Sequence, residues 1–251
     1  MQHTDNGRKQ TDSLSETKVY SASVDCLADP ELYQKTLALL PAQRRESAER
    51  MKIESGKRLS AGAGLLLMAA LADWMAQPQR TDQQEAFLQK LPELRRVNFA
   101  QGEHGKPYLP DCPQVHFNLS HSGNRVMCVV SSLPCGCDVE RVERRQKNIE
   151  MVIRCLAESE QRLAAVSAVS FCRIWTLKES ILKLSGKGIS IPLNSFEVSL
   201  EPLAVKQDFM DGPVVLKEYN DYREDYCCAC ALAGTAPPEK MTEVDLREIL
   251  T

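Results

Sequence analysis

The spacing of apolar and polar residues predicts one strand and then a series of helices in the first part of the chain. Residues 18–27 alternate between the two kinds of residue, which favours a strand. Helices are then predicted over residues 30–40, 42–53, 59–76 and 80–92. The third of these helices is the most apolar, so we expect it to be buried.

Residues 117–140 combine two polar clusters with an apolar run between them. The first cluster, residues 117–123, reads Phe-Asn-Leu-Ser-His-Ser-Gly and favours a turn that presents polar groups to a ligand. Residues 126–130 are apolar and predict a strand. The second cluster is Gly-Cys-Asp-Val-Glu, and on a strand Asp138 and Glu140 would project from the same face. Neighbouring carboxylates repel each other, and a bound hard cation such as Mg²⁺ is one reason for them to lie together.

The last part of the chain predicts further helices, followed by strands. The helices are expected over residues 149–154, 159–169 and 171–185, and the strands over residues 192–200, 214–219 and 226–231. We expect the last two strands to form an antiparallel pair and residues 242–250 to contain a short helix. The pattern predicts a flexible tail over residues 1–17, a first half over residues 18–133 and a second half over residues 134–251.

The composition is that of a globular protein, with 43% hydrophobic and 26% charged residues. Apolar runs stay shorter than the roughly 18–20 residues of a membrane-spanning helix. Residues 1–16 are polar and lack the apolar core of a secretory signal, so we expect a cytoplasmic protein. The net charge of −3 argues against nucleic acid as a general partner.

The chain has ten cysteines, which raises the question of disulfides or zinc. Cys227 and Cys230 form an isolated Cys-x-x-Cys, without the second pair or nearby histidines of a zinc site. Cys135 and Cys137 could bind a metal or be redox-active, although their strand spacing favours packing. Several cysteines lie in apolar runs, where a free cysteine behaves as a small hydrophobic residue. We therefore expect reduced cysteines, as in cytosolic proteins.

The predicted helix over residues 171–185 has two distinct faces. Its apolar face is formed by Ile174, Leu177, Ile181 and Leu184. Glu179 and Lys183 lie four residues apart on another face, where an exposed pair would contribute only a few tenths of a kcal/mol, roughly. The acids earlier in the chain, Asp138 and Glu140, favour a functional role for this pair instead. A third carboxylate would complete a hard-cation site, and a lysine beside it suits a phosphate.

Short motifs occur along the chain in a fixed order. They are Gly-Lys-Pro at residues 105–107, Phe-Asn-Leu-Ser-His-Ser-Gly at 117–123, Gly-Cys-Asp-Val-Glu at 136–140, Trp-Thr-Leu-Lys-Glu-Ser-Ile-Leu-Lys at 175–183, Gly-Lys-Gly-Ile-Ser at 186–190 and Pro-Leu at 192–193. With this set, the chain from about residue 19 onward resembles the 4′-phosphopantetheinyl transferases of the long, Sfp-type class. The resemblance implies an α+β fold of two similar subdomains related by a pseudo-twofold. Each subdomain would be a small, mainly antiparallel sheet packed with helices, and coenzyme A would bind at their interface.

The resemblance also implies an activity and a reaction centre. The activity is Mg²⁺-dependent transfer of phosphopantetheine from coenzyme A to a serine of an acyl or peptidyl carrier protein, with release of adenosine 3′,5′-bisphosphate. Asp138, Glu140 and Glu179 resemble the Mg²⁺ ligands of the family. Glu179 also resembles the general base for the carrier serine. Lys183 resembles the residue that neutralises charge on the pyrophosphate.

Five further residues match positions of the family that contact coenzyme A. Ser120 and His121 resemble the pair that holds its phosphates, and Lys106 the lysine at its nucleotide end. Arg58, aided by Arg44, resembles the partner of the 3′-phosphate, which the planar guanidinium suits.

Three other positions leave the match less complete. Lys178 matches the coenzyme A site as well, with a solvated helix lysine as the alternative. Glu160 resembles a family acid near the site, or serves only as a charge at a helix N-terminus. Gln43 stands where the family often has a basic residue, which puts part of the 3′-phosphate pocket in question.

Other classes of function stay open at this point. One is a non-catalytic module that binds coenzyme A or a carrier protein with the same fold, and another is a metal-stabilised structural protein. Gly-Lys-Gly at residues 186–188 lacks the spacing of a nucleotide phosphate loop and follows a helix. We expect a monomer with neither nucleic-acid nor membrane partners, and the sequence does not indicate which carrier protein is served.

Overall fold

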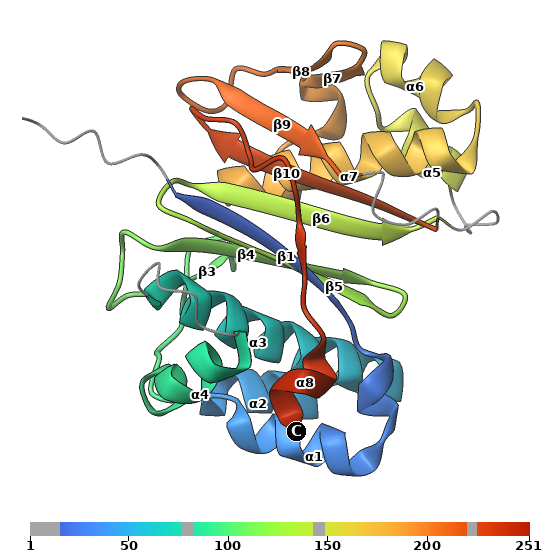
Figure 1. Ribbon diagram of the computed structural model, residues 1–251. Helices are drawn as coiled ribbons and strands as arrows, with labels where there is room; N and C mark the ends of the chain where they lie inside the picture. Colours follow the sequence, from blue (N-terminus) through green and yellow to red (C-terminus); the bar gives the residue numbers. More distant parts are fainter. Residues whose placement is uncertain (1–15, 77–82, 143–148, 220–224) are drawn as a thin grey trace, which may run out of the picture.

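The computed structural model describes residues 16–76, 83–142, 149–219 and 225–251 of the chain. Two groups of helices lie on opposite sides of a central region of strands (Figure 1). This arrangement confirms the predicted α+β class with small, mainly antiparallel sheets. The pseudo-twofold relation between the halves stays a prediction. Within the described ranges, every helix is too short or too polar to cross a membrane.

The first half contains a sheet covered by helices. Its helices are α1 (Pro30–Leu39), α2 (Ala42–Glu49), α3 (Glu54–Met75) and α4 (Gln83–Leu94). The strand order in its sheet is β11 (Thr242–Glu243), β1 (Thr17–Ser23), β5 (Arg125–Ser131) and β4 (His116–Ser122). A small hairpin of β2 (Ala100–Gln101) and β3 (Pro107–Tyr108) precedes β4.

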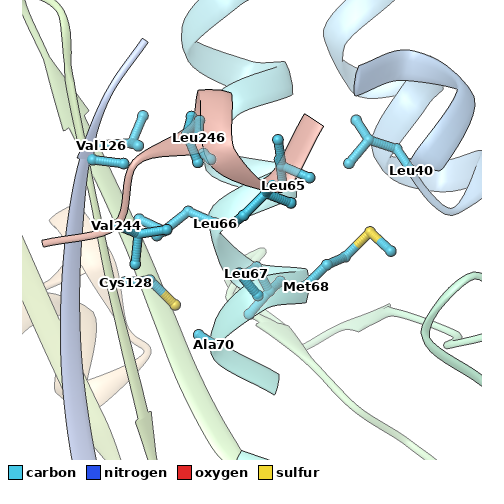
Figure 2. Packing of buried hydrophobic residues seen from close by; sticks show 14 of the residues in the cluster. Leu40, Leu65, Leu66, Leu67, Met68, Ala70, Val126, Cys128, Val244 and Leu246 are labelled. Carbon is cyan, nitrogen blue, oxygen red and sulfur yellow. The ribbon is translucent and has the colours of Figure 1, made fainter. Parts of the chain in front are cut away.

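Helix α3 is the buried centre of the first core, as its apolar sequence predicts. Leu65 and Leu66 are fully buried and belong to the same apolar cluster as Val126 of β5 (Figure 2). Val244 and Leu246, from the last residues of the chain, complete the same core. Burial of apolar surface of this extent is the main stabilising contribution to such a core.

The second half has its own sheet and helices. The strand order is β6 (Cys135–Arg141), β10 (Tyr226–Ala233) and β9 (Val214–Glu218). The helices are α5 (Ile149–Arg154), α6 (Glu158–Ala164) and α7 (Ala168–Ser185), and a hairpin is formed by β7 (Glu197–Leu200) and β8 (Leu203–Lys206). The predicted antiparallel pairing of the last two long strands is confirmed by β9 and β10.

The two sheets meet through an apolar cluster. Val19 and Met127 of the first sheet pack with Cys137, Val139 and Cys230 of the second. The first sheet therefore packs against helices on one face and against the second sheet on its other face. This contact fixes β4 and β6 relative to each other, and these strands carry the polar residues of the site.

Several sequence predictions are corrected by these elements. Residues 117–122 are not a turn: they lie in strand β4, and the reversal begins only at Gly123, whose φ of 59° suits glycine. Strand alternation explains the error, because Asn, Ser and Ser at every second position share one face. The predicted strand over residues 192–200 is a strand only over β7, and the hairpin partner β8 was missed.

The end of the chain returns to the first half. Residues 242–243 form strand β11, parallel to β1, and only Leu246–Leu250 (α8) are helical within the helix predicted over 242–250. Ile249 and Leu250 pack into the core around α3. These residues thus contribute to the first core, although they were predicted within the second half. The predicted tail over residues 1–17 lies outside the described residues except for its last two positions.

Candidate active site

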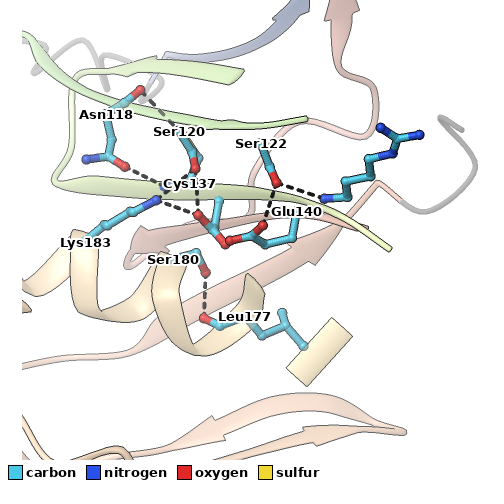
Figure 3. A network of polar contacts seen from close by, with 10 residues as sticks. Asn118, Ser120, Ser122, Cys137, Glu140, Leu177, Ser180 and Lys183 are labelled. Atoms are coloured by element: carbon cyan, nitrogen blue, oxygen red, sulfur yellow. Dashed lines mark hydrogen bonds and ion pairs between the residues drawn. The ribbon is translucent and has the colours of Figure 1, made fainter. Parts of the chain in front are cut away.

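Strand β4, strand β6 and helix α7 bring Ser120, Asp138 and Lys183 together. The Ser120 hydroxyl donates to Asp138 Oδ1 at 2.7 Å, and Lys183 Nζ donates to the same oxygen at 2.5 Å. Lys183 also donates to Ser120 Oγ at 2.9 Å. These contacts, drawn in Figure 3, join residues that lie up to 63 positions apart in the sequence.

The close approach of α7 to β6 depends on Gly136. A Cβ atom at this position would lie 2.1 Å from the Ser180 carbonyl oxygen and 2.4 Å from the Leu184 nitrogen. The absence of a side chain therefore lets the helix lie directly against the strand. The apolar face of α7 packs into the second core. Glu179 and Lys183 lie on the other side of the helix, toward the acids of β6.

Glu140 lies on the same face of β6 as Asp138, as predicted from their spacing. Its carboxylate accepts a hydrogen bond from the Ser122 hydroxyl at 2.7 Å. Ser122 is a neighbour of Glu140 that the sequence patterns did not single out. The sequence does contain a sign of this contact: in a strand over residues 117–122, Ser120 and Ser122 share one face.

Asp138 influences the pKa of both Glu140 and Glu179. Burial raises the pKa of Asp138, although its bonds with Lys183 and Ser120 oppose the change. The pKa of Glu140 is raised by burial and also by the charge of Asp138. Burial likewise raises the pKa of Glu179, and Asp138 adds to the shift. Carboxylates that disfavour each other's charge form a local environment that a cation would relieve.

The acids fit Mg²⁺ by chemistry, although they do not form a closed ligand set. Within the described ranges, no three potential ligands are grouped closely enough to hold an ion by themselves. Asp138 Oδ2, however, is buried and has no hydrogen-bond partner. An orphaned carboxylate oxygen of this kind is costly unless a further group binds it. Hard oxygen donors that leave room for water and phosphate oxygens are what Mg²⁺ prefers.

Two further basic residues, His121 and Arg44, interact electrostatically with each other, and His121 also with Lys183. Burial lowers the pKa of His121, and the charges of Lys183 and Arg44 lower it further. The exposed His121 ring is therefore neutral at pH 7. Arg44 Nε is buried and without a hydrogen-bond partner, and burial lowers the pKa of this guanidinium. The Arg44 guanidinium therefore has a donor that a bound anion, such as a phosphate group, could accept from.

Lys106 bridges the two halves. Its ammonium donates to the carbonyl oxygens of Cys135 at 2.8 Å and Leu184 at 3.1 Å. Burial lowers the pKa of Lys106. The predicted contact of this lysine with the nucleotide stays a prediction, and its observed bonds hold the β2–β3 hairpin against β6 and α7.

Lys178 lies inside the second half instead of at a ligand surface. Its side chain and that of Glu160 are both 0% exposed, and the two are joined at 2.7 Å. Lys178 Nζ also donates to the Phe196 carbonyl at 2.7 Å and lies 3.9 Å from the centre of the Phe196 ring. Glu160 accepts from the backbone nitrogens of Ala157 and Val198. We therefore assign both residues to the interior, and neither a coenzyme A contact nor a solvated helix position describes Lys178.

Arg58 lies at the start of α3, apart from the acids. It lines a surface pocket of about 580 Å³ together with Tyr33 and Lys57. The structure thus provides two basic regions, one at Arg44 and His121 and one at Arg58 and Lys57. The predicted role of Arg58 toward a 3′-phosphate stays a prediction. Gln43, next to Arg44, uses its side-chain oxygen to accept from the Phe99 nitrogen.

Comparison with known proteins agrees with this geometry. A family profile described as the 4′-phosphopantetheinyl transferase superfamily matches residues 134–231, which include all three acids and Lys183. The 4′-phosphopantetheinyl transferase Sfp of Bacillus subtilis (strain 168) is 28% identical over 241 residues, covering 93% of this chain and 100% of the relative. The 4′-phosphopantetheinyl transferase gsp of Aneurinibacillus migulanus is 33% identical over 61% of this chain and 66% of the relative. The chain therefore belongs to the 4′-phosphopantetheinyl transferase superfamily, and within it to the Sfp-type class.

Proposed function

We propose that this protein transfers the 4′-phosphopantetheine group of coenzyme A to a serine of an acyl or peptidyl carrier protein. The reaction converts the apo-carrier to the holo-carrier and releases adenosine 3′,5′-bisphosphate. The names of the relatives support the transfer. The observation that carries the proposal for this chain is the contact of Lys183 with Asp138, with Glu140 on the same strand β6 and Glu179 one turn from Lys183 on α7.

Asp138, Glu140 and Glu179 are the residues that would hold Mg²⁺ in this proposal. The unpartnered Asp138 Oδ2 is the oxygen most in need of a further ligand. When bound, the ion would offset the charge of the pyrophosphate oxygens. Ser120 and Ser122 would orient the carboxylates of β6, because each donates to one of them.

Glu179 and Lys183 would carry out the protein's part in the chemistry. The carrier serine attacks the β-phosphorus of coenzyme A, the phosphoanhydride bond breaks, and the nucleotide leaves. Glu179 would accept the proton of the serine hydroxyl, and its raised pKa suits a group that must bind a proton. Lys183 is protonated: burial alone would lower its pKa, but the charge and hydrogen bond of Asp138, together with the charges of Cys137 and Glu179, raise it. It would donate to the pyrophosphate as negative charge builds up.

The basic residues would bind the rest of coenzyme A. Arg44 has a buried donor without a partner, and the pKa of His121 responds to the charges of both Lys183 and Arg44. These two residues, with Ser120, would contact phosphate groups. Arg58 would bind the 3′-phosphate, which the guanidinium fork suits. Two of the three ammonium hydrogens of Lys106 bond to carbonyl oxygens, and the third would contact the nucleotide end.

Mass spectrometry of apo-carrier proteins tests the proposal. Acyl and peptidyl carriers are incubated with coenzyme A, Mg²⁺ and the protein, and the mass of a phosphopantetheine group is expected on the serine of at least one of them. A non-catalytic binding module would instead show a coenzyme A-dependent rise in melting temperature with every carrier left in the apo form. Failure of every carrier to gain this mass would refute the transferase activity.

A further inference from the structure

Two cysteines that are far apart in the sequence meet between α7 and β10. Cys172 lies in the first turns of α7, and Cys227 lies near the start of β10. The Cys227 thiol lies 3.9 Å from the carbonyl oxygen of Val169, one turn before Cys172 on α7, which places the two cysteines side by side. This contact is separate from the packing of the other buried cysteines, since Cys135, Cys137, Cys228 and Cys230 belong to the cluster between the sheets.

The structure changes the meaning of the Cys-x-x-Cys sequence. Cys227 and Cys230 lie on one strand with two residues between them, so their side chains point to opposite faces of the sheet. Cys230 faces the other sheet, where it packs in the apolar cluster. Cys227 faces α7, where its thiol contacts the Val169 carbonyl oxygen one turn away from Cys172. The dithiol pair is therefore formed by tertiary structure and not by the local motif.

The pair lies beside the backbone of Glu140. The Cys172 thiol donates weakly to the Glu140 carbonyl oxygen at 3.6 Å, and Cys227 is the residue paired with Glu140 across the sheet. The Cys227 thiol contacts the Val169 carbonyl oxygen at 3.9 Å. A covalent link here would join the helix that carries Glu179 and Lys183 to the sheet that carries Glu140.

The burial of the pair limits the kind of oxidant. Cys172 is 2% exposed and Cys227 is 3% exposed, so a bulky thiol–disulfide reagent has no direct path to either sulfur. A small neutral molecule such as hydrogen peroxide is of the size of a water molecule or two. The relevant oxidant class is therefore a peroxide.

We propose that Cys172 and Cys227 form an oxidisable dithiol site that hydrogen peroxide converts to a disulfide between α7 and β10. One sulfur attacks the peroxide, the O–O bond breaks, and a sulfenic acid and one water are formed. The other sulfur then attacks the sulfenic sulfur, the S–S bond forms, and a second water leaves. Two thiols and one peroxide give one disulfide and two waters, and each sulfur is oxidised by one electron.

Peptide mapping tests the site directly in the full-length protein. The reduced protein is treated with hydrogen peroxide, free thiols are alkylated, and the protein is digested without reduction. The expected result is a peptide pair joined through Cys172 and Cys227 that separates after treatment with dithiothreitol. Exposed Cys112 and Cys155 report that the oxidant was active. Oxidation of these two without the cross-link, or a cross-link to a different cysteine, would overturn the proposal.

Variants separate the tertiary pair from the sequence motif. Cys230→Ser is the matched control, and it should leave the cross-link intact because Cys230 faces away from α7. Cys172→Ser should abolish the cross-link and leave a sulfenic acid on Cys227, which dimedone traps once the oxidised protein is denatured and the sulfur becomes accessible. If a variant fails to fold, the mapping of the unmodified protein still decides the question. Loss of the cross-link in Cys230→Ser would refute the assigned partner.

Discussion

Lys183 Nζ lies 2.5 Å from Asp138 Oδ1, where it provides the positive charge that this buried carboxylate requires. The other oxygen of Asp138 has no partner. A divalent cation that approached Asp138 would meet the ammonium already in contact with the same side chain. Lys183 therefore has two expected effects: it competes with the metal while coenzyme A is absent, and it assists the reaction when the pyrophosphate is present.

Lys183→Met is expected to separate these two effects. Removal of the ammonium should tighten the binding of Mg²⁺ alone, measured by titration calorimetry, because a competing cation is lost. The same change should lower the transfer rate about 10²–10³-fold, the usual cost of removing one preorganised electrostatic donor. Lys206→Met, at an exposed lysine of β8, is the control for loss of charge. Weaker metal binding in Lys183→Met would contradict the competition.

Glu179→Gln tests the proposed base and ligand. The change keeps the shape of the side chain, so coenzyme A binding and the melting temperature should change little. The transfer rate should fall by about 10²–10⁴-fold, the range for loss of a positioned general base. Glu103→Gln, at an exposed glutamate, serves as the matched control. A normal rate in Glu179→Gln would remove this residue from the reaction.

Metal removal is expected to stop transfer without unfolding the protein. Chelation with EDTA should reduce phosphopantetheine transfer to background, and added Mg²⁺ should restore it, because the pyrophosphate charge needs a counterion. The fold should persist, since the cores are apolar and Lys183 neutralises Asp138 without a metal. Circular dichroism monitors the fold beside the activity assay. Full activity in EDTA would rule out a metal requirement.

Lys178→Met is expected to destabilise the second half by about 3–5 kcal/mol, because it leaves the charge of Glu160 buried and unpaired. Urea unfolding measures the change in free energy. The double variant Lys178→Met, Glu160→Gln should recover much of the loss, because glutamine keeps an oxygen for the backbone nitrogens of Ala157 and Val198. A single variant as stable as the unmodified protein would contradict the structural role of the pair.

Gly136→Ala is expected to disrupt the contact between β6 and α7. The new methyl group would overlap the Ser180 carbonyl, so the helix must move away, at a cost of about 1–3 kcal/mol or more. Gly102→Ala is the matched control, because its nearest neighbour would be the Lys106 oxygen at 3.6 Å, an ordinary contact. Thermal unfolding compares the two. Equal stabilities would mean that β6 and α7 can separate without loss.

Sequence patterns predicted the long elements well, because their signals are local. The apolar face of α7 and the apolar length of α3 follow directly from residue spacing, and Asp138 and Glu140 share a face because strand geometry has a period of two. Strand β4 was wrongly predicted as a turn. Gly123 and the small polar residues before it resemble a turn, and only pairing with β5 makes them a strand.

The partners of charged residues were harder to predict, because tertiary contacts decide them. Lys178 and Glu160 are 18 positions apart and meet only after α6 and α7 pack. The same holds for Lys106, whose partners lie on β6 and α7. A lysine in a motif reads the same in the sequence whether it binds a ligand or a buried carboxylate. Burial distinguishes these cases, and burial is a property of the fold.

The return of β11 and α8 to the first half has a consequence for the order of folding. Val244, Leu246 and Ile249 cover α3, yet they are synthesised more than a hundred residues after β5. A ribosome-bound chain that has emerged only through β6 must keep part of this apolar helix uncovered. Closing such a long loop costs entropy and delays the final packing step. The two halves are therefore expected to reach their native state together, as one cooperative unit.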